Sequence, residues 1–318
     1  MRTARPGVFL CAWAVLFVAL GPLASQDRAA SPAETAESVP TMRVEILGAS
    51  VSAGFVDSPL TGGSKDNASA PLVLPLRRWL DGEGQKVQSR ADAMMFLEPE
   101  KRGRTQVDRA LRSEPSVVVA VDFLFWYGYG AVDGKSDAEG EERMRRLRVG
   151  LETLDLLPCG IVVGDLPDMR GADRRMLKPH QVPNEADLAA MNGAIATWAT
   201  GRPRVRVFPL GQLVASMKQE GVTLSVEDRQ FATAPGYLLQ GDRLHATRLG
   251  VAYLAHALHE PIRAALSEDL RERAMARTFV EFCAFTSAEA ELADAEALSK
   301  KAESSSSGSP EKAQSGGR

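Results

Sequence analysis

Residues 44–54 read Val-Glu-Ile-Leu-Gly-Ala-Ser-Val-Ser-Ala-Gly. The run from Val44 to Leu47 is short, mostly apolar and followed by a glycine, which is typical of a buried strand. Gly48 permits a sharp turn, and a helix can begin at Ser50. A strand that leads through a tight turn into a helix is the repeating unit of α/β proteins. This stretch therefore predicts an α/β fold.

The same alternation continues along the chain. Three more strand-like runs are Val117 to Val121, Gly160 to Val163 and Val205 to Pro209. Helical patterns cover Leu72 to Leu80, Thr105 to Arg112, Glu141 to Leu156, Glu185 to Thr200 and Leu249 to Leu266. Most strand-like runs do not alternate apolar with polar residues, as expected for strands covered on both faces. Together they predict a three-layer α/β/α sandwich with a mostly parallel sheet. Ligands of such sheets bind beyond the carboxyl ends of the strands.

The composition excludes some classes of partner. The chain has 318 residues, of which 44% are hydrophobic and 25% charged, with a formal net charge of −3. That balance is typical of a globular protein and offers no general attraction to nucleic acid. The histidines and cysteines show no spacing typical of metal ligands, so no metal is expected.

The two ends differ in composition from the middle. Arg2 and Arg5 precede an apolar run and then small residues, which is typical of a secretory signal. Residues 1–25 are therefore interpreted as a signal peptide of a secreted or periplasmic protein. An uncleaved membrane anchor is the alternative, although the run is shorter than the ~20 residues that span a bilayer. Residues 26–41 predict a disordered linker, 42–285 the folded domain, and 286–318 a helical extension with a disordered tail.

Two segments far apart in the sequence carry candidate chemistry. Ser50 follows the first strand, where its hydroxyl could act as a nucleophile or merely cap a helix. Residues 242–250 read Asp-Arg-Leu-His-Ala-Thr-Arg-Leu-Gly. Here His245 could take and return the serine proton, while Asp242 orients the ring. An acid before a loop histidine is common by itself, but the combination with Ser50 is much less common.

These residues resemble a known family. GASVSAG, from Gly48 to Gly54, is similar to the first block of the SGNH/GDSL hydrolases, and DRLHATRLG to their DxxH block. The resemblance covers most of residues 42–266. It implies a flavodoxin-like five-stranded sheet and an esterase that needs no cofactor. By position it makes Ser50 the nucleophile, His245 the general base and Asp242 its partner.

The resemblance is weakest at the expected oxyanion hole. It implies that the backbone N–H groups of Ser50 and Gly103 bind the oxyanion, although Gly103 could equally be a flexible turn. After the third strand the family has Gly-x-Asn-Asp, whereas this chain has Asp122 and no amide donor. Losing one donor costs about 10²- to 10³-fold in turnover. The Tyr127 hydroxyl is one candidate replacement, and Asp122 could stabilise an oxyanion only when protonated.

Aromatic residues follow the strand-like run from Val117 to Val121. Phe125, Trp126 and Tyr127 are candidates for lining the substrate site, and the alternative is that they belong to the core. The sequence thus predicts an exported serine esterase that acts on acyl or acetyl esters, either small molecules or esters of glycans and lipids. Because the amide donor is missing, weak activity is one expectation. The alternative is an inactive binding or scaffold protein of the same fold, and no protein partner is predicted.

Overall fold

Five parallel strands form the central sheet of the computed structural model, which describes residues 41–306 except 81, 83 and 133–135. The strands are β1 (Met42–Ile46), β2 (Gln85–Ser89), β3 (Val117–Ala120), β4 (Gly160–Gly164) and β5 (Val205–Phe208). They lie in the order β2-β1-β3-β4-β5, which is the flavodoxin-like order. The predicted fold class and all four predicted strands are confirmed. Residues 1–40 and 307–318, which include the predicted signal peptide and most of the linker and tail, lie outside the described part.

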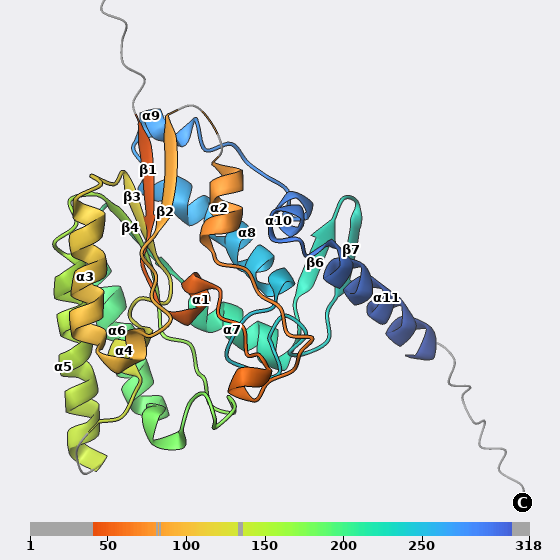
Figure 1. The fold of residues 1–318 in the computed structure, drawn as a ribbon, viewed down its shortest axis with the longest axis horizontal. Coiled ribbons are helices and arrows are strands. Elements are labelled where there is room, and N and C mark those ends of the chain that lie inside the picture. Colours follow the sequence, from red (N-terminus) through yellow and green to blue (C-terminus); the bar gives the residue numbers. More distant parts are fainter. Residues whose placement is uncertain (1–40, 81, 83, 133–135, 307–318) are drawn as a thin grey trace, which may run out of the picture. The chain divides into compact units, whose positions relative to one another are not determined.

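Helices cover both faces of the sheet (Figure 1). One layer contains α3 (Pro99–Leu111), α5 (Ser136–Leu154) and α6 (Glu185–Ala199), which pack against one another. The other contains α2 (Val73–Trp79), α8 (Arg248–Ala265) and α10 (Phe279–Thr286). Alternate residues of β3 divide between the two cores: Val117 and Val119 face the α8 side, and Val118 and Ala120 the α5 side. This burial on both faces explains the uninterrupted apolar runs.

Two sheet elements were not predicted. The edge strand β2 has the sequence QKVQS, in which only Val87 is buried, so it lacks the apolar signal of the central strands. The short strands β6 (Thr223–Val226) and β7 (Arg229–Ala232) form a separate antiparallel hairpin. The remaining helices are α1 (Ser50–Ala53), α4 (Phe125–Gly128), α7 (Leu210–Gln219), α9 (Glu268–Arg271) and α11 (Glu289–Ser306), with 3₁₀ turns η1 (Pro59–Thr61), η2 (Met95–Leu97) and η3 (Pro179–Gln181).

The last helix packs onto the same unit. α11 contacts α8, α10 and β7, and the Glu291 carboxylate accepts the backbone N–H of Leu249 at 2.8 Å. A carboxylate at this position satisfies an N-terminal amide of α8 and interacts favourably with the helix dipole. In the part of the chain that the structure describes, no helix combines the length and apolar character needed to cross a bilayer.

Candidate active site

Ser50, His245 and Asp242 form a continuous hydrogen-bonded line. The Ser50 Oγ lies 3.0 Å from His245 Nε2, and His245 Nδ1 lies 2.6 Å from Asp242 Oδ2. His245 and Asp242 are buried, whereas Ser50 is half-buried. The three sequence-predicted side chains therefore meet at the carboxyl edge of the sheet, in the geometry of a nucleophile, a base and an orienting acid.

The loop that carries the histidine is held by short-range hydrogen bonds. Asp242 Oδ1 accepts the backbone N–H groups of Leu244 at 2.9 Å and His245 at 3.0 Å. Arg243 adopts a left-handed conformation with a φ of 56°, which lets the chain turn back so tightly. Burial alone would raise the pKa of Asp242, but the hydrogen bonds and the charge of His245, together with the two backbone N–H groups, lower it overall. Asp242 therefore stays ionised beside the ring.

Gln240 also positions the site, and sequence reasoning did not identify it. Its buried side chain donates to the carbonyls of Phe55 and Ala246, each at 2.9 Å, and accepts the N–H of Asp57 at 2.8 Å. The amide thus joins the loop after α1 to the histidine loop. A lone glutamine carries no sequence signal for such a role, because its partners are backbone atoms.

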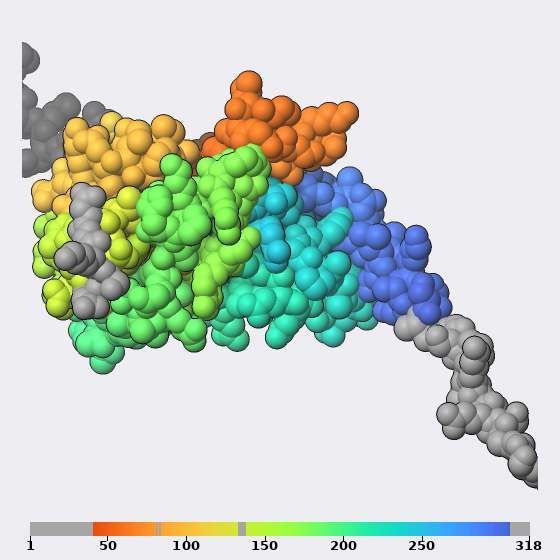
Figure 2. Space-filling model, turned by 90° about the horizontal axis from the view of Figure 1, so that it is seen from below, coloured from red at the N-terminus to blue at the C-terminus, as the bar shows by residue number. Residues whose placement is uncertain are grey.

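A third loop, which follows β4, supports the other two. The Asp173 N–H donates to the carbonyl of Asp242 at 2.8 Å. Arg175 donates to the carbonyl of Thr61 at 2.6 Å and forms an ion pair with Asp57 at 3.4 Å. Figure 2 looks onto this end of the molecule, where the orange residues near 60 and the green residues near 170 lie side by side.

Asp122 ties β3 to the turn from Gly48 to Ser52, which is called the nucleophile turn after the role predicted for Ser50. Its Oδ2 accepts the N–H groups of Val51 at 2.9 Å and Ser52 at 3.1 Å, and its Oδ1 lies 2.5 Å from Ser52 Oγ. Burial raises the pKa of Asp122 despite these hydrogen bonds. A Cβ on Gly48 would lie 2.0 Å from Asp122 Oδ1, so only glycine fits the turn.

The structure corrects the prediction for Gly103. This residue lies inside α3, which begins at Pro99 rather than at Thr105. Proline favours the first position of a helix, which explains the earlier start. The glycine is needed there because a Cβ would lie 2.1 Å from the Tyr127 Oη. Gly103 and Tyr127 therefore pack together, and neither is among the residues that surround the cavity beside Ser50.

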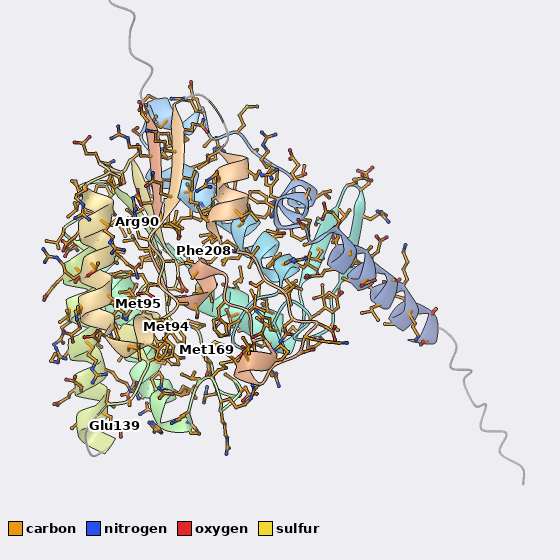
Figure 3. The ribbon with its side chains drawn as sticks, in the orientation of Figure 1. Arg90, Met94, Met95, Glu139, Met169 and Phe208 are labelled. Atoms are coloured by element: carbon orange, nitrogen blue, oxygen red, sulfur yellow. The ribbon has the colours of Figure 1, made fainter. Side chains whose placement is uncertain are left out.

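The loop after β2 contacts the turn that carries Ser50. The segment after β2 is fixed to the nucleophile turn, because the N–H of Asp92 donates to the carbonyl of Gly48 at 3.0 Å. The next residue, Ala93, belongs to the same turn: the side chain of Asp92 accepts the N–H of Met94 at 2.8 Å, across Ala93. Figure 3 labels Met94 and Met95 in this segment.

The three aromatic residues predicted to line the substrate site do not all lie beside it. Phe125 lines the cavity next to Ser50. Trp126 and Tyr127 instead face a separate surface hollow that Phe96 and Arg145 also line, and both side chains are buried. Of the three candidates, only Phe125 lies beside the site. Among the described residues, no group of three or more His, Cys, Asp or Glu side chains could hold a metal ion.

Comparisons with known proteins gave structural matches only. No protein-family model and no curated protein sequence matches the chain. Its structure is similar to that of TesA, with 14% identity, 71% of this chain and 100% of that chain covered, and a TM-score of 0.41. For a GDSL-like lipase from Bacteroides thetaiotaomicron, the identity is 14%, the coverage 73% and 89%, and the TM-score 0.37. For a variant of an acetyl-xylooligosaccharide esterase from Geobacillus, the identity is 13% and the TM-score 0.40. The match covers 70% of this chain and 94% of that chain.

Proposed function

We propose that the chain is an exported serine ester hydrolase that cleaves carboxylic esters through an acyl-enzyme on Ser50. The supporting observation is the hydrogen-bonded line from Ser50 Oγ to His245 at 3.0 Å and from His245 to Asp242 at 2.6 Å. A serine activated by a histidine, which a buried carboxylate orients in turn, is the arrangement that acyl transfer requires.

The reaction proceeds in two halves. The Ser50 oxygen attacks the ester carbonyl while its proton passes to His245 Nε2. The tetrahedral intermediate collapses, and the same proton goes to the leaving alcohol. A water molecule then attacks the acyl-enzyme and gives its proton to His245, which returns it to Ser50 as the carboxylic acid leaves. Asp242 stays ionised and stabilises each imidazolium, in line with its lowered pKa.

Backbone N–H groups supply the oxyanion contacts in this proposal. Ser50 is the first residue of α1, so its N–H has no acceptor within the helix. Asp122 accepts the next two N–H groups, those of Val51 and Ser52, and leaves the Ser50 N–H to the substrate. We assign the second contact to the N–H of Ala93 rather than to Gly103, because the Asp92 hydrogen bond holds that loop against Gly48.

A binding protein without useful catalysis is the second candidate, and Asp122 is the observation that favours it. An ionised carboxylate beside the nucleophile turn would repel an oxyanion. Its raised pKa acts against this repulsion, because the neutral acid then persists to higher pH. Retention of a complete Ser50, His245 and Asp242 line favours catalysis over binding alone.

A fluorophosphonate probe tests the function directly. The Ser50 oxygen should displace fluoride from phosphorus and add one phosphonyl group, which intact mass measures. The adduct should be absent from the Ser50→Ala and His245→Ala variants and present in Ser64→Ala, a control at an exposed serine. If folded wild-type protein gave no adduct and cleaved no ester, the binding protein would be the better proposal.

Export is proposed from the sequence of residues 1–25. Expression of the full chain in a bacterial host should yield a mature protein that begins after Ala24 or Ser25, measured by N-terminal sequencing of the exported fraction. Recovery of the intact N-terminus in the membrane fraction would support the uncleaved anchor instead.

A further inference from the structure

An apolar cavity begins at Ser50. α7 forms one wall with Leu210, Leu213, Val214 and Met217. These positions are spaced i, i+3, i+4 and i+7, so they form a single face of the helix. These side chains belong to the hydrophobic core or pack against it, and toward the cavity they present an apolar surface.

The other walls are also mostly apolar. α8 contributes Leu254, α4 contributes Phe125, and the loop after β4 contributes Met169, which Figure 3 labels. Beyond the nucleophile turn, Asp122 is the one ionisable side chain among the lining residues, and its hydrogen bonds to α1 occupy both carboxyl oxygens. An ester portion with charges or many hydroxyl groups would lose its hydration here without gaining partners.

The position of the cavity relative to the base identifies which half of an ester it fits. Ser50 lines the cavity, but His245 does not, although its neighbours Leu244 and Ala246 do. The leaving alcohol must receive its proton from His245, so it must lie on the histidine side of Ser50. The acyl group stays bonded to Ser50, which lines the cavity, so we assign the cavity to the acyl half of the ester.

The volume limits the length of the chain. The cavity measures about 50 Å³, and a water-sized group occupies roughly 10–15 Å³. About four such groups fit. Resting on the proposed ester hydrolysis, we propose that the cavity binds the acyl chain and selects short unbranched acyl groups of about four carbon atoms.

Chain-length profiles test the proposal. For p-nitrophenyl esters, kcat/KM should rise by roughly threefold to tenfold per methylene from acetate to butyrate, as apolar area enters the cavity. It should then fall at least tenfold by octanoate, because the longer acyl chain exceeds the volume of the cavity. Equal rates from acetate to octanoate would overturn the proposal.

Two variants of α7 should move the optimal acyl-chain length in opposite directions. Met217→Ala removes a buried wall side chain and should shift the optimum by about two carbons, toward hexanoate. Val214→Phe fills the cavity and should shift it to acetate. Met191→Ala is the matched control, because Met191 is equally buried in α6 but does not line the cavity. The control should keep the butyrate optimum, even if its stability falls.

Phosphonylation by a small fluorophosphonate separates the two proposals. Wild-type labelling at Ser50, with a flat profile that Met217→Ala does not change, would refute the acyl cavity and retain the hydrolase. An optimum that followed the length of the alcohol instead would place the leaving group in the cavity. Loss of both labelling and hydrolysis in folded wild-type protein would refute the hydrolase itself. Should Val214→Phe fail to fold, Met217→Ala still decides the outcome.

Discussion

The carboxyl group of Asp122 lies 2.5 Å from the hydroxyl of Ser52, on the turn that carries Ser50. The same carboxyl accepts the N–H groups of Val51 and Ser52. An acid thus occupies the place where the family resemblance implied an amide donor. Its protonation state therefore sets the charge on the turn that carries Ser50.

Replacing Asp122 by asparagine should raise turnover at alkaline pH. The amide oxygen can still accept the N–H groups of Val51 and Ser52, while the negative charge is gone. Since the pKa of Asp122 is raised by burial, the wild type loses the neutral form only as the pH climbs through that raised value. The ratio of variant to wild-type kcat should therefore increase with pH, reaching about tenfold. A ratio independent of pH, or below one throughout, would contradict this role.

The same group should affect stability. The folded-state pKa of Asp122 lies above its unfolded value, so its contribution is fully present below the unfolded pKa and is lost as pH rises through the folded pKa. In urea titrations between pH 4 and 8, the free energy of unfolding of Asp122→Asn minus that of wild type should grow with pH. A constant difference would show that Asp122 titrates alike in both states.

Asp242→Asn should abolish most activity while the protein stays folded. Its side-chain oxygen can still accept the N–H groups of Leu244 and His245, but its NH₂ would face His245 Nδ1 and favour the wrong ring tautomer. We expect kcat to fall by about 10⁴-fold with little change in far-UV circular dichroism. Asp173→Asn is the control, because only the backbone of Asp173 contacts Asp242. Activity within tenfold of wild type would refute the orienting role.

Lower pH should weaken the contribution of Asp242 to stability. Its folded-state pKa is lowered, so that contribution is present above the unfolded pKa and is lost as pH falls through the folded one. The difference in unfolding free energy between wild type and Asp242→Asn should therefore shrink below about pH 4. A difference that held constant between pH 6 and pH 3 would mean that the stabilisation does not depend on the charge.

Gly48→Ala tests the close approach at the nucleophile turn. The added Cβ would lie 2.0 Å from Asp122 Oδ1 and 2.6 Å from Ser52 Oγ, so the turn must shift. We expect a loss of roughly 2 kcal/mol or more in unfolding free energy and a large loss of activity. In a double-mutant cycle with Asp122→Ala, the two changes should couple by about 1 kcal/mol or more. If the two changes in unfolding free energy simply added, the cost of Gly48→Ala would not come from its contact with Asp122.

Glu291→Ala should destabilise the fold through α8. The variant removes the carboxylate that accepts the Leu249 N–H at 2.8 Å, and the expected loss is about 1 kcal/mol. Chemical denaturation measures it. Glu289→Ala, at an exposed position of the same helix, should change stability by less than about 0.5 kcal/mol. Equal effects of the two variants would argue against a specific contact.

Several features could be predicted from sequence because their causes are local. Short, mostly apolar runs indicated β1, β3, β4 and β5, which the structure confirms. The strand β2 has only one buried residue, so its sequence lacks the apolar pattern of a buried strand. Its strand conformation follows from the hydrogen bonds to β1. The helical state of Gly103 was missed for a related reason: glycine weakens a helix locally, and only the adjacent Tyr127 explains its presence.

By itself, the sequence determined the strand-turn-helix unit around Gly48 and the Asp242-to-His245 spacing, because hydrogen bonds and backbone preferences act over a few residues. Tertiary structure alone decided the contact between Ser50 and His245, which are 195 residues apart. It also decided the hydrogen bonds between Asp122 and α1, and the cavity between α7 and α8. These depend on how β1, β3 and the later helices pack. Packing joins surfaces from distant segments, and no local pattern specifies which surfaces meet.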